Sequence, residues 1–307
     1  MIEIISALWP VFALILLGYA ARKSGFLTDD FWGQAEKATY FVLFPILLVS
    51  RLASTDMTAV PLDQVGLAVV LLVFGGSLLV FLAKPFLKVD AAGITSIYQG
   101  GVRFNVYVGL AASATLFGPQ GVVVGAVVMA LMIPLLNFCC VLVFSYFTRS
   151  TQDLKSVLLA LLKNPLIVGS LCGLLLNQTG VGFPNLLMPI AEFLGRMALP
   201  LGLLSVGAGL SFKVLMKSGQ ALCATSLIKL LLMPLLAFLI CVVLGLPNAE
   251  IIWLYAALPT AASSYILARQ LGGDVQMMAA IITGQTLFSM LTIPFMMIFL
   301  NFLQKSL

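Results

Sequence analysis

Runs of about 20 apolar residues follow one another along almost the whole chain, and this feature limits the fold more than any other. A helix needs about 20 such residues to cross ~30 Å of hydrocarbon, and unpaired backbone groups are not tolerated in lipid. Ten runs fit within the 307 residues, which leaves little chain for a soluble domain. We expect an all-α polytopic membrane protein with ten spans, near residues 4–21, 35–52, 64–83, 92–116, 120–147, 155–176, 185–210, 217–246, 250–270 and 275–303.

The composition supports a membrane protein and argues against several other classes. Hydrophobic residues make up 62% and charged residues 9% of the chain, whereas soluble domains carry about 25% charged residues. The net charge of +5 comes from scattered cations and not from a basic stripe, so no nucleic-acid partner is expected. The chain has no histidine and no nucleotide-binding, nucleophile or metal-binding motif. We therefore expect no enzyme activity, no cofactor and no metal.

Lysine and arginine are distributed unevenly between the two sides of the predicted spans. If the N-terminus is outside, two of these cations, Arg51 and Lys305, also lie outside. The cytoplasmic connections then hold Arg22, Lys23, Lys84, Lys88, Arg149, Lys155, Lys213, Lys217 and Arg269. This bias predicts a multi-pass protein of the plasma membrane, in bacteria the inner membrane, with both termini outside.

Proline positions indicate that the chain contains two similar halves. The second span has LFPILLVS around Pro45, and the seventh has LPLGLLS around Pro200. Pro134 in the fifth span lies 89 residues after Pro45, and Pro294 in the tenth lies 94 residues after Pro200. Five is an odd number of spans, so the second copy enters the membrane from the opposite side, as in many secondary transporters. The predicted repeats are residues 1–147 and 148–307.

Two equivalent spans contain residues that favour a broken helix. The fourth span reads ITSIYQGGVRFNVYVGLAAS, with Arg103 and Asn105 among glycines, and the ninth reads LYAALPTAASSYILARQ, with Pro259 in its middle. Broken helices that meet at mid-membrane form substrate sites in secondary transporters, and their amino ends attract anions. The alternative is that Pro259 only kinks its helix and that the glycines allow close packing.

Arg103 is costly at this depth and therefore needs a partner. Arginine at the centre of a bilayer costs at least about 2.5 kcal/mol on insertion scales. Its partner could be an acid, the carbonyls of a broken helix or a bound anion, and its planar fork suits a carboxylate. Of these partners, a bound anion explains the residue best.

Other intramembrane charges have simpler interpretations. Glu192 and Arg196 stand four residues apart in one span, so they are expected to neutralise each other, with gating or proton coupling as the alternative. Glu192 is interpreted as the only acid deep in a span. Lys229 has no acid at helical spacing; it could snorkel, contact the carbonyls of the breaks or supply a second positive charge.

Uncharged polar residues near the breaks complete the candidate site. Asn137, Ser263, Gln285 and Ser289 could join helices or contact the ligand, and Tyr107 could line a pocket for a planar acid or pack against lipid. The predicted substrate-binding residues are Arg103, Asn105, Tyr107, Asn137, Pro259, Thr260, Ser263 and Gln285.

Several segments in the same order resemble the auxin efflux carrier family, which includes plant PIN exporters and bacterial carriers of malonate and similar acids. They are ILLGYAARK, FPILLVS, RFNVYVG, KNPLIVGSLCG, ALPLGLLSVGAGL, KLLLMPL and ALPTAASSYILARQ, and they cover essentially the whole chain. The resemblance implies two inverted five-helix repeats, with helices 4 and 9 broken and crossing. It implies a mobile transport domain of helices 3–5 and 8–10, and a scaffold of helices 1, 2, 6 and 7 that forms a dimer. Asn105 would contact a carboxylate and Pro259 would be the crossover proline. Many members have a proline shortly after Gly109, where this chain has Leu110 and Ala111.

These features together predict a secondary transporter of small organic anions that works by an elevator-type displacement. The expected partners are the anion, the lipid bilayer and a second copy of the chain. One alternative is a sodium- or proton-coupled transporter of the same fold with a different substrate. The other is a membrane sensor that binds an acid without transporting it.

Overall fold

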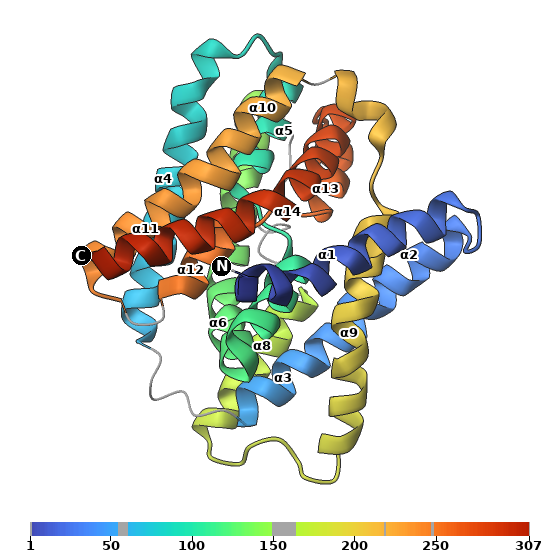
Figure 1. Ribbon diagram of the computed structural model, residues 1–307, viewed down its shortest axis with the longest axis vertical. Helices are drawn as coiled ribbons and strands as arrows, with labels where there is room; N and C mark the ends of the chain where they lie inside the picture. The colour runs from blue at the N-terminus through green and yellow to red at the C-terminus, as the bar shows by residue number, and fades with distance from the viewer. Residues whose placement is uncertain (1, 55–60, 149–163, 218, 247–248, 307) are drawn as a thin grey trace.

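The computed structural model describes residues 2–54, 61–148, 164–217, 219–246 and 249–306, and every regular element within these ranges is helical (Figure 1). Seven helical segments in the described ranges are long and apolar enough to cross a membrane, and the shorter Pro165–Gln178 is also apolar. Helices satisfy their own backbone amides and carbonyls, which lipid cannot do. The prediction of an all-α polytopic membrane protein is confirmed.

The first half of the chain contains a helical segment that runs on through three elements. A π-helical turn joins α2 to α3, so that Asp29–Ser54 is one continuous segment of 26 residues. The elements are α1 (Ile2–Lys23), α2 (Asp29–Ala38), the π-helical turn η1 (Thr39–Leu43), α3 (Phe44–Ser54), α4 (Leu62–Ala83), the 3₁₀ turn η2 (Lys84–Phe86), α5 (Ala91–Val102) and α6 (Val106–Thr148).

The second half is also helical, and a second π-helical turn lies within its eighth predicted span. The elements are α8 (Pro165–Gln178), α9 (Met188–Ala208), the 3₁₀ turn η3 (Phe212–Lys217), α10 (Gly219–Leu227), the π-helical turn η4 (Ile228–Leu232), α11 (Met233–Leu244), α12 (Ala249–Ala257), α13 (Ser263–Leu271) and α14 (Val275–Ser306). The first part of the predicted sixth span, 155–163, lies outside the described residues, as do Arg149 and Lys155.

The second predicted span begins earlier than expected. The sequence predicted a helix from residue 35, but α2 begins at Asp29. Thr28 precedes it, and its hydroxyl accepts a hydrogen bond from the Phe31 amide at 3.3 Å. Asp29 and Asp30 follow in the first turn, where acidic side chains are stabilised. This polar cap adds nearly two turns to the amino end of the span.

The fourth and ninth predicted spans are both interrupted. Residues 103–105 separate α5 from α6, and residues 258–262 separate α12 from α13. The α6 element holds the end of the fourth span and the whole of the fifth. It bends at Gly118, whose φ of 64° is one that glycine adopts readily. The prediction of two broken helices is therefore confirmed.

The helices pack in pairs that match between the two halves. Among the described elements, α1 packs on α9 and α3 packs on α8, which pairs the first span with the seventh and the second with the sixth. These two pairs exchange places when the halves are exchanged. A second group forms around α4, α11 and α14, and Figure 1 shows α4 and α10 in the upper part of the view and α3, α8 and α9 in the lower part. The exact boundary between the repeats stays a prediction.

Glycine allows the backbones of α1 and α9 to touch. A Cβ atom on Gly18 would collide with the Leu204 carbonyl, and one on Gly207 would collide with the Ile15 carbonyl. Small residues permit such close approach between membrane helices, where dispersion contacts drive association. The α1–α9 pair is consequently a tight unit.

Candidate functional site

The two helix breaks meet in the interior of the protein. The Asn105 amide, in the break between α5 and α6, donates to the Pro259 carbonyl at 2.8 Å. Pro259 lies in the break between α12 and α13 and is fully buried. Proline leaves the chain without a donor at this point and interrupts the helix. The two segments that the sequence singled out therefore cross each other directly.

Gln285 of α14 joins the two breaks through backbone groups. Its Oε1 atom accepts from the Thr260 amide at 2.9 Å, and its Nε2 atom donates to the Gly100 carbonyl at 2.9 Å. The Thr260 hydroxyl donates to the Gln99 carbonyl at 3.1 Å. Gln285 and Thr260 are fully buried. The structure thus gives both residues a role in holding the crossing together, and a direct contact with substrate stays a prediction for them.

Lys229 neutralises the carboxyl end of α12. It lies in η4 with no exposed surface, and its Nζ atom donates to the Ala256 carbonyl at 2.8 Å and to the Tyr255 carbonyl at 3.4 Å. A cation at a helix carboxyl end is stabilised by the partial negative charge there. Of the three roles open from the sequence, contact with the carbonyls of a break is the one that the structure shows. π-Helical turns are often found at functional sites.

Asn105 caps one half-helix and has one amide group left over. Its Oδ1 atom accepts from the amides of Tyr107 at 3.0 Å and Val108 at 3.3 Å, which caps the amino end of α6. Its Nδ2 atom has no hydrogen-bond partner among the described residues, although the residue is 1% exposed. A buried donor without a partner costs about 1–3 kcal/mol. The Nδ2 group therefore keeps an unused donor at the crossing.

Arg103 ends α5 and lies beside the start of α13. Its Nη2 atom donates to the Ser263 hydroxyl at 3.1 Å, while the buried Nη1 atom has no hydrogen-bond partner among the described residues. No carboxylate of the described residues forms a salt bridge with it. The guanidinium thus keeps donor capacity within the protein interior, as a residue that binds an anion requires.

A cavity of about 610 Å³ brings these groups together, and we call it the inner cavity. Five predicted residues line it: Arg103, Asn105, Tyr107, Asn137 and Ser263. The others are Gly33, Glu36, Lys37, Tyr40, Phe41, Val106, Val141, Ala261, Ala262, Ile266, Leu267 and Gln270. A smaller cavity of about 100 Å³ shares Arg103, Asn137 and Ser263 with it and reaches Asn164.

Glu36 is an acidic lining residue that the sequence did not predict for the site. The interpretation of Glu192 as the only acid deep in a span is wrong, because Glu36 lies within the continuous segment Asp29–Ser54 and lines the inner cavity. Its spacing from Tyr40, one helical turn away, was a signal that both could share a face. With the helix beginning at Asp29 and not at residue 35, Glu36 lies about two turns inside it and not at its end.

Tyr107 closes the inner cavity on one side. It is 7% exposed and stacks on Phe44, with ring centroids 5.1 Å apart. A Cβ atom on Gly202 of α9 would lie 3.1 Å from the Tyr107 ring and 3.2 Å from the Phe44 ring, so glycine leaves room for the ring pair. Tyr107 therefore packs inside the protein and not against lipid.

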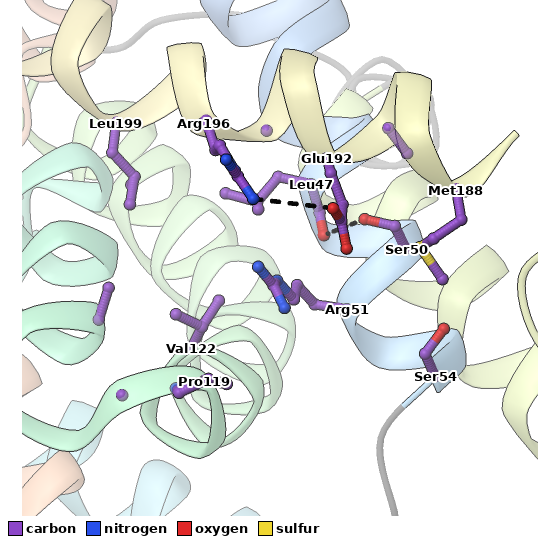
Figure 2. A pocket seen from close by; sticks show the side chains of 14 residues that line it. Leu47, Ser50, Arg51, Ser54, Pro119, Val122, Met188, Glu192, Arg196 and Leu199 are labelled. Carbon is purple, nitrogen blue, oxygen red and sulfur yellow. Dashed lines mark hydrogen bonds and ion pairs between the residues drawn. The ribbon is translucent and has the colours of Figure 1, made fainter.

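A second cavity, of about 390 Å³, is lined by residues farther along α3 and α6 than Phe44 and Tyr107, and we call it the outer cavity (Figure 2). It is formed by α3, α6 and α9, and Arg51, Glu192 and Arg196 line it. Glu192 and Arg196 form the ion pair expected from their spacing, with 3.8 Å between Oε2 and Nη2. Both α3, with the segment that leads into it, and α6 contribute to the two cavities: Tyr40 and Tyr107 line the inner one, and Leu47 and Ala114 line the outer one.

An all-helical polytopic protein in which two broken helices cross beside a polar cavity is a membrane transporter by architecture. Residues 124–297 match the family described as Membrane transport protein, which is more than half of the chain, so the chain belongs to this family. A protein of Methanothermobacter thermautotrophicus described as an uncharacterized transporter is 24% identical over 291 residues, 92% of this chain and 94% of the relative. The protein is thus a transporter, in a family that is not one of enzymes.

Proposed function

We propose that the protein is a secondary transporter of small organic anions that carry a carboxylate. The observation that carries this proposal is the Asn105 Nδ2 group, a buried donor without a partner among the described residues, on a side chain that lines the inner cavity together with Arg103. Two donors, one of them charged, can bind the two oxygens of one carboxylate. The resemblance to auxin efflux carriers supports the same substrate class.

The amino end of α13 adds positive potential at the same place. Ala261, Ala262 and Ser263 form its start and line the inner cavity. The amides of Ser264 and Tyr265 already bond to backbone carbonyls, so α13 contributes through its helix dipole, whose positive end attracts an anion. At α6 the Asn105 side chain already occupies this position, so the anion is expected to bind at α13 and to reach Asn105 from the side of its Nδ2 atom.

The size of the inner cavity suits a metabolite and not a macromolecule. Ligand pockets of about 300–1,000 Å³ enclose small molecules, and about 610 Å³ falls in this range. Tyr40, Phe41 and Tyr107 supply aromatic surface, which would accept a planar acid as well as an aliphatic one.

The packing groups suggest how the anion moves. We infer an elevator-type displacement in which α4, α5, α6 and α10–α14 move against a scaffold of α1, α2, α3, α8 and α9. Support comes from the backbone contact between α1 and α9, which ties two scaffold helices together. We further propose that the scaffold forms a homodimer and that the carrier resides in the plasma membrane with both termini outside.

Flux measurements test the proposal directly. Purified protein in liposomes should take up or release labelled monocarboxylates and dicarboxylates, among them malonate. Asn105→Asp protein at the same density is the matched control, because it keeps the cap on α6 and loses the Nδ2 donor. A folded wild-type protein that moves none of the acids would refute the proposal.

Coupling to a cation is the second candidate, and Glu36 is the observation that favours it. An acid in a transport cavity can carry a proton or help to bind sodium. Among the described residues no group of three or more His, Cys, Asp or Glu side chains could hold a metal ion, so a sodium site would need backbone oxygens as well. Current or a pH change driven by a sodium gradient without any organic acid would favour this candidate. Binding of an acid without flux would instead indicate a sensor.

A further inference from the structure

The outer cavity contains charges that the proposed transport site does not use. Arg51 reaches it from α3, and Glu192 and Arg196 reach it from α9. Figure 2 shows these three side chains pointing into the same space, with Ser50 and Ser54 on one side. Among the described residues that line it, the charged groups are two guanidinium groups and one carboxylate.

Helix ends explain only part of this arrangement. Arg51 lies in the last turn of α3, and Glu192 lies near the start of α9, where a cation and an anion are respectively stabilised. Arg196 is in the interior of α9, which continues to Ala208. Its position therefore needs another reason.

The ion pair between Arg196 and Glu192 is too weak to be that reason. The 3.8 Å between Nη2 and Oε2 is longer than a hydrogen bond, and the Arg196 guanidinium makes no hydrogen bond to the described residues. The side chain of Arg196 is 75% exposed and that of Glu192 is 49% exposed. Exposed pairs of this kind contribute little to stability. An anion entering the cavity would find the Arg196 fork largely available.

The place of the outer cavity in the fold gives it a relation to transport. Tyr40 lines the inner cavity and Leu47 lines the outer one, and Phe44 lies between them on the same continuous helical segment. Gly118 and Pro119, at the amino end of the fifth span, form another wall and add positive potential. An anion that leaves the inner cavity past the Phe44–Tyr107 pair would enter the outer cavity next.

We propose that the outer cavity is a second carboxylate-binding site, in which Arg196 exchanges Glu192 for the carboxylate of the anion. The identity of the ligand rests on the proposed function. Arginine binds carboxylates through two parallel hydrogen bonds, which the long contact with Glu192 does not provide. Glu192 also limits the affinity of the outer cavity for the anion, because its carboxylate repels the anion and pairs with Arg196 again when the anion leaves.

Equilibrium binding of labelled malonate to purified protein in detergent tests this site without any need for flux. The wild type should bind at two classes of site. Arg196→Gln should weaken the class in the outer cavity about tenfold or more, as expected for a lost charge-assisted hydrogen bond, and leave the other class unchanged. Asn105→Asp should do the reverse. Glu192→Gln should tighten the outer class, since it removes a competitor and a like charge.

Two further variants separate binding from general effects of charge or folding. Arg196→Lys keeps the charge and should retain part of the outer binding. Lys305→Gln removes a cation from an exposed position outside the cavity and should change neither class. Melting temperatures of the Arg196, Glu192 and Lys305 variants should stay close to that of the wild type, because the replaced side chains are exposed.

The outcomes distinguish this inference from the proposed function. A single class of site that Asn105→Asp removes and Arg196→Gln leaves intact would overturn the second site, while the transport proposal would stand. Unchanged binding in Glu192→Gln together with Arg196→Gln would overturn it equally. Two classes of site in a protein that moves no acid across a liposome membrane would keep the second site and refute transport.

Discussion

Replacing Asn105 by aspartate separates the two roles that the structure gives to this side chain. The Oδ1 atom caps α6 through the amides of Tyr107 and Val108, and aspartate keeps an oxygen at this position. The Nδ2 atom becomes a second carboxylate oxygen on a side chain that lines the inner cavity. We therefore expect Asn105→Asp to fold with nearly unchanged stability and to lose anion binding.

The magnitude follows from two terms. A lost hydrogen bond to a charged ligand costs about 1.5–3 kcal/mol. Two like charges about 4 Å apart repel by about 4 kcal/mol at an effective dielectric constant of about 20. Together they amount to about 6 kcal/mol, which corresponds to a loss in affinity of more than a thousandfold.

Asn105→Ala provides the comparison, because it removes the donor and the cap without adding a charge. It should weaken anion binding about tenfold, as expected for one lost hydrogen bond. It should also lower the free energy of unfolding by about 1 kcal/mol, the usual effect of losing a cap. Thermal melting with and without a carboxylate measures both quantities, since a ligand that binds only the folded protein stabilises it by RT ln(1 + [L]/Kd). Wild-type affinity in Asn105→Asp would refute the anion site, and a strongly destabilised Asn105→Asp would refute the cap.

Three further predictions follow from the contacts of the crossing. Arg103→Lys should retain part of the transport, whereas Arg103→Gln should lose about 2 kcal/mol of anion binding. The melting temperature should not change, because among the described residues Arg103 bonds to Ser263 and to no backbone carbonyl. A joint fall in binding and melting temperature would instead indicate a structural role. Gln285→Leu should lower the free energy of unfolding by about 2–6 kcal/mol, since it leaves the buried Thr260 amide and Gly100 carbonyl unpaired. Denaturant titration of the purified protein measures this free energy. A stable variant with a raised KM would make Gln285 a substrate contact. Glu36→Gln should raise the affinity for anions and reduce the dependence of this affinity on pH, because a carboxylate is removed from the inner cavity. If the variant and the wild type have the same Kd at every pH of a series, Glu36 takes no part in coupling.

The spans and breaks were predictable because lipid limits the choices of the chain. Apolar length alone sets the number of helices, and a guanidinium beside an asparagine in an apolar run has few explanations other than a ligand or an interrupted backbone. Pro259 identified the second break for the same reason. The contact between the Asn105 amide and the Pro259 carbonyl confirms that these two positions belong together.

The sequence did not predict which polar side chains of the site bond to the backbone and which line the inner cavity. Gln285 and Asn137 looked alike in the sequence, as single amides in apolar helices. Gln285 is fully buried and bonds to the backbone of both breaks, whereas Asn137 lines the inner cavity. The difference depends on which way each side chain points toward segments that are far away in the sequence. The position of Lys229 beneath α12 depends on the same long-range packing, because its acceptors are carbonyls and carry no signal in the sequence.

The single helical segment that borders both cavities, Asp29–Ser54, also gives a length for the proposed displacement of the crossing. Tyr40 and Leu47 are seven residues apart, and at 1.5 Å per residue a crossing that passes from one to the other travels about 10 Å. That stroke is about a third of the hydrocarbon thickness, so the membrane voltage does about 0.8 kcal/mol of work per 100 mV on each charge that moves. In the displacement proposed above, Arg103 and the Lys229 cation would travel with the crossing, so a bound monoanion would lower the moving charge by one and the empty carrier would feel the voltage more strongly. The inside-negative potential of a cell would then draw the empty crossing toward the cytoplasm.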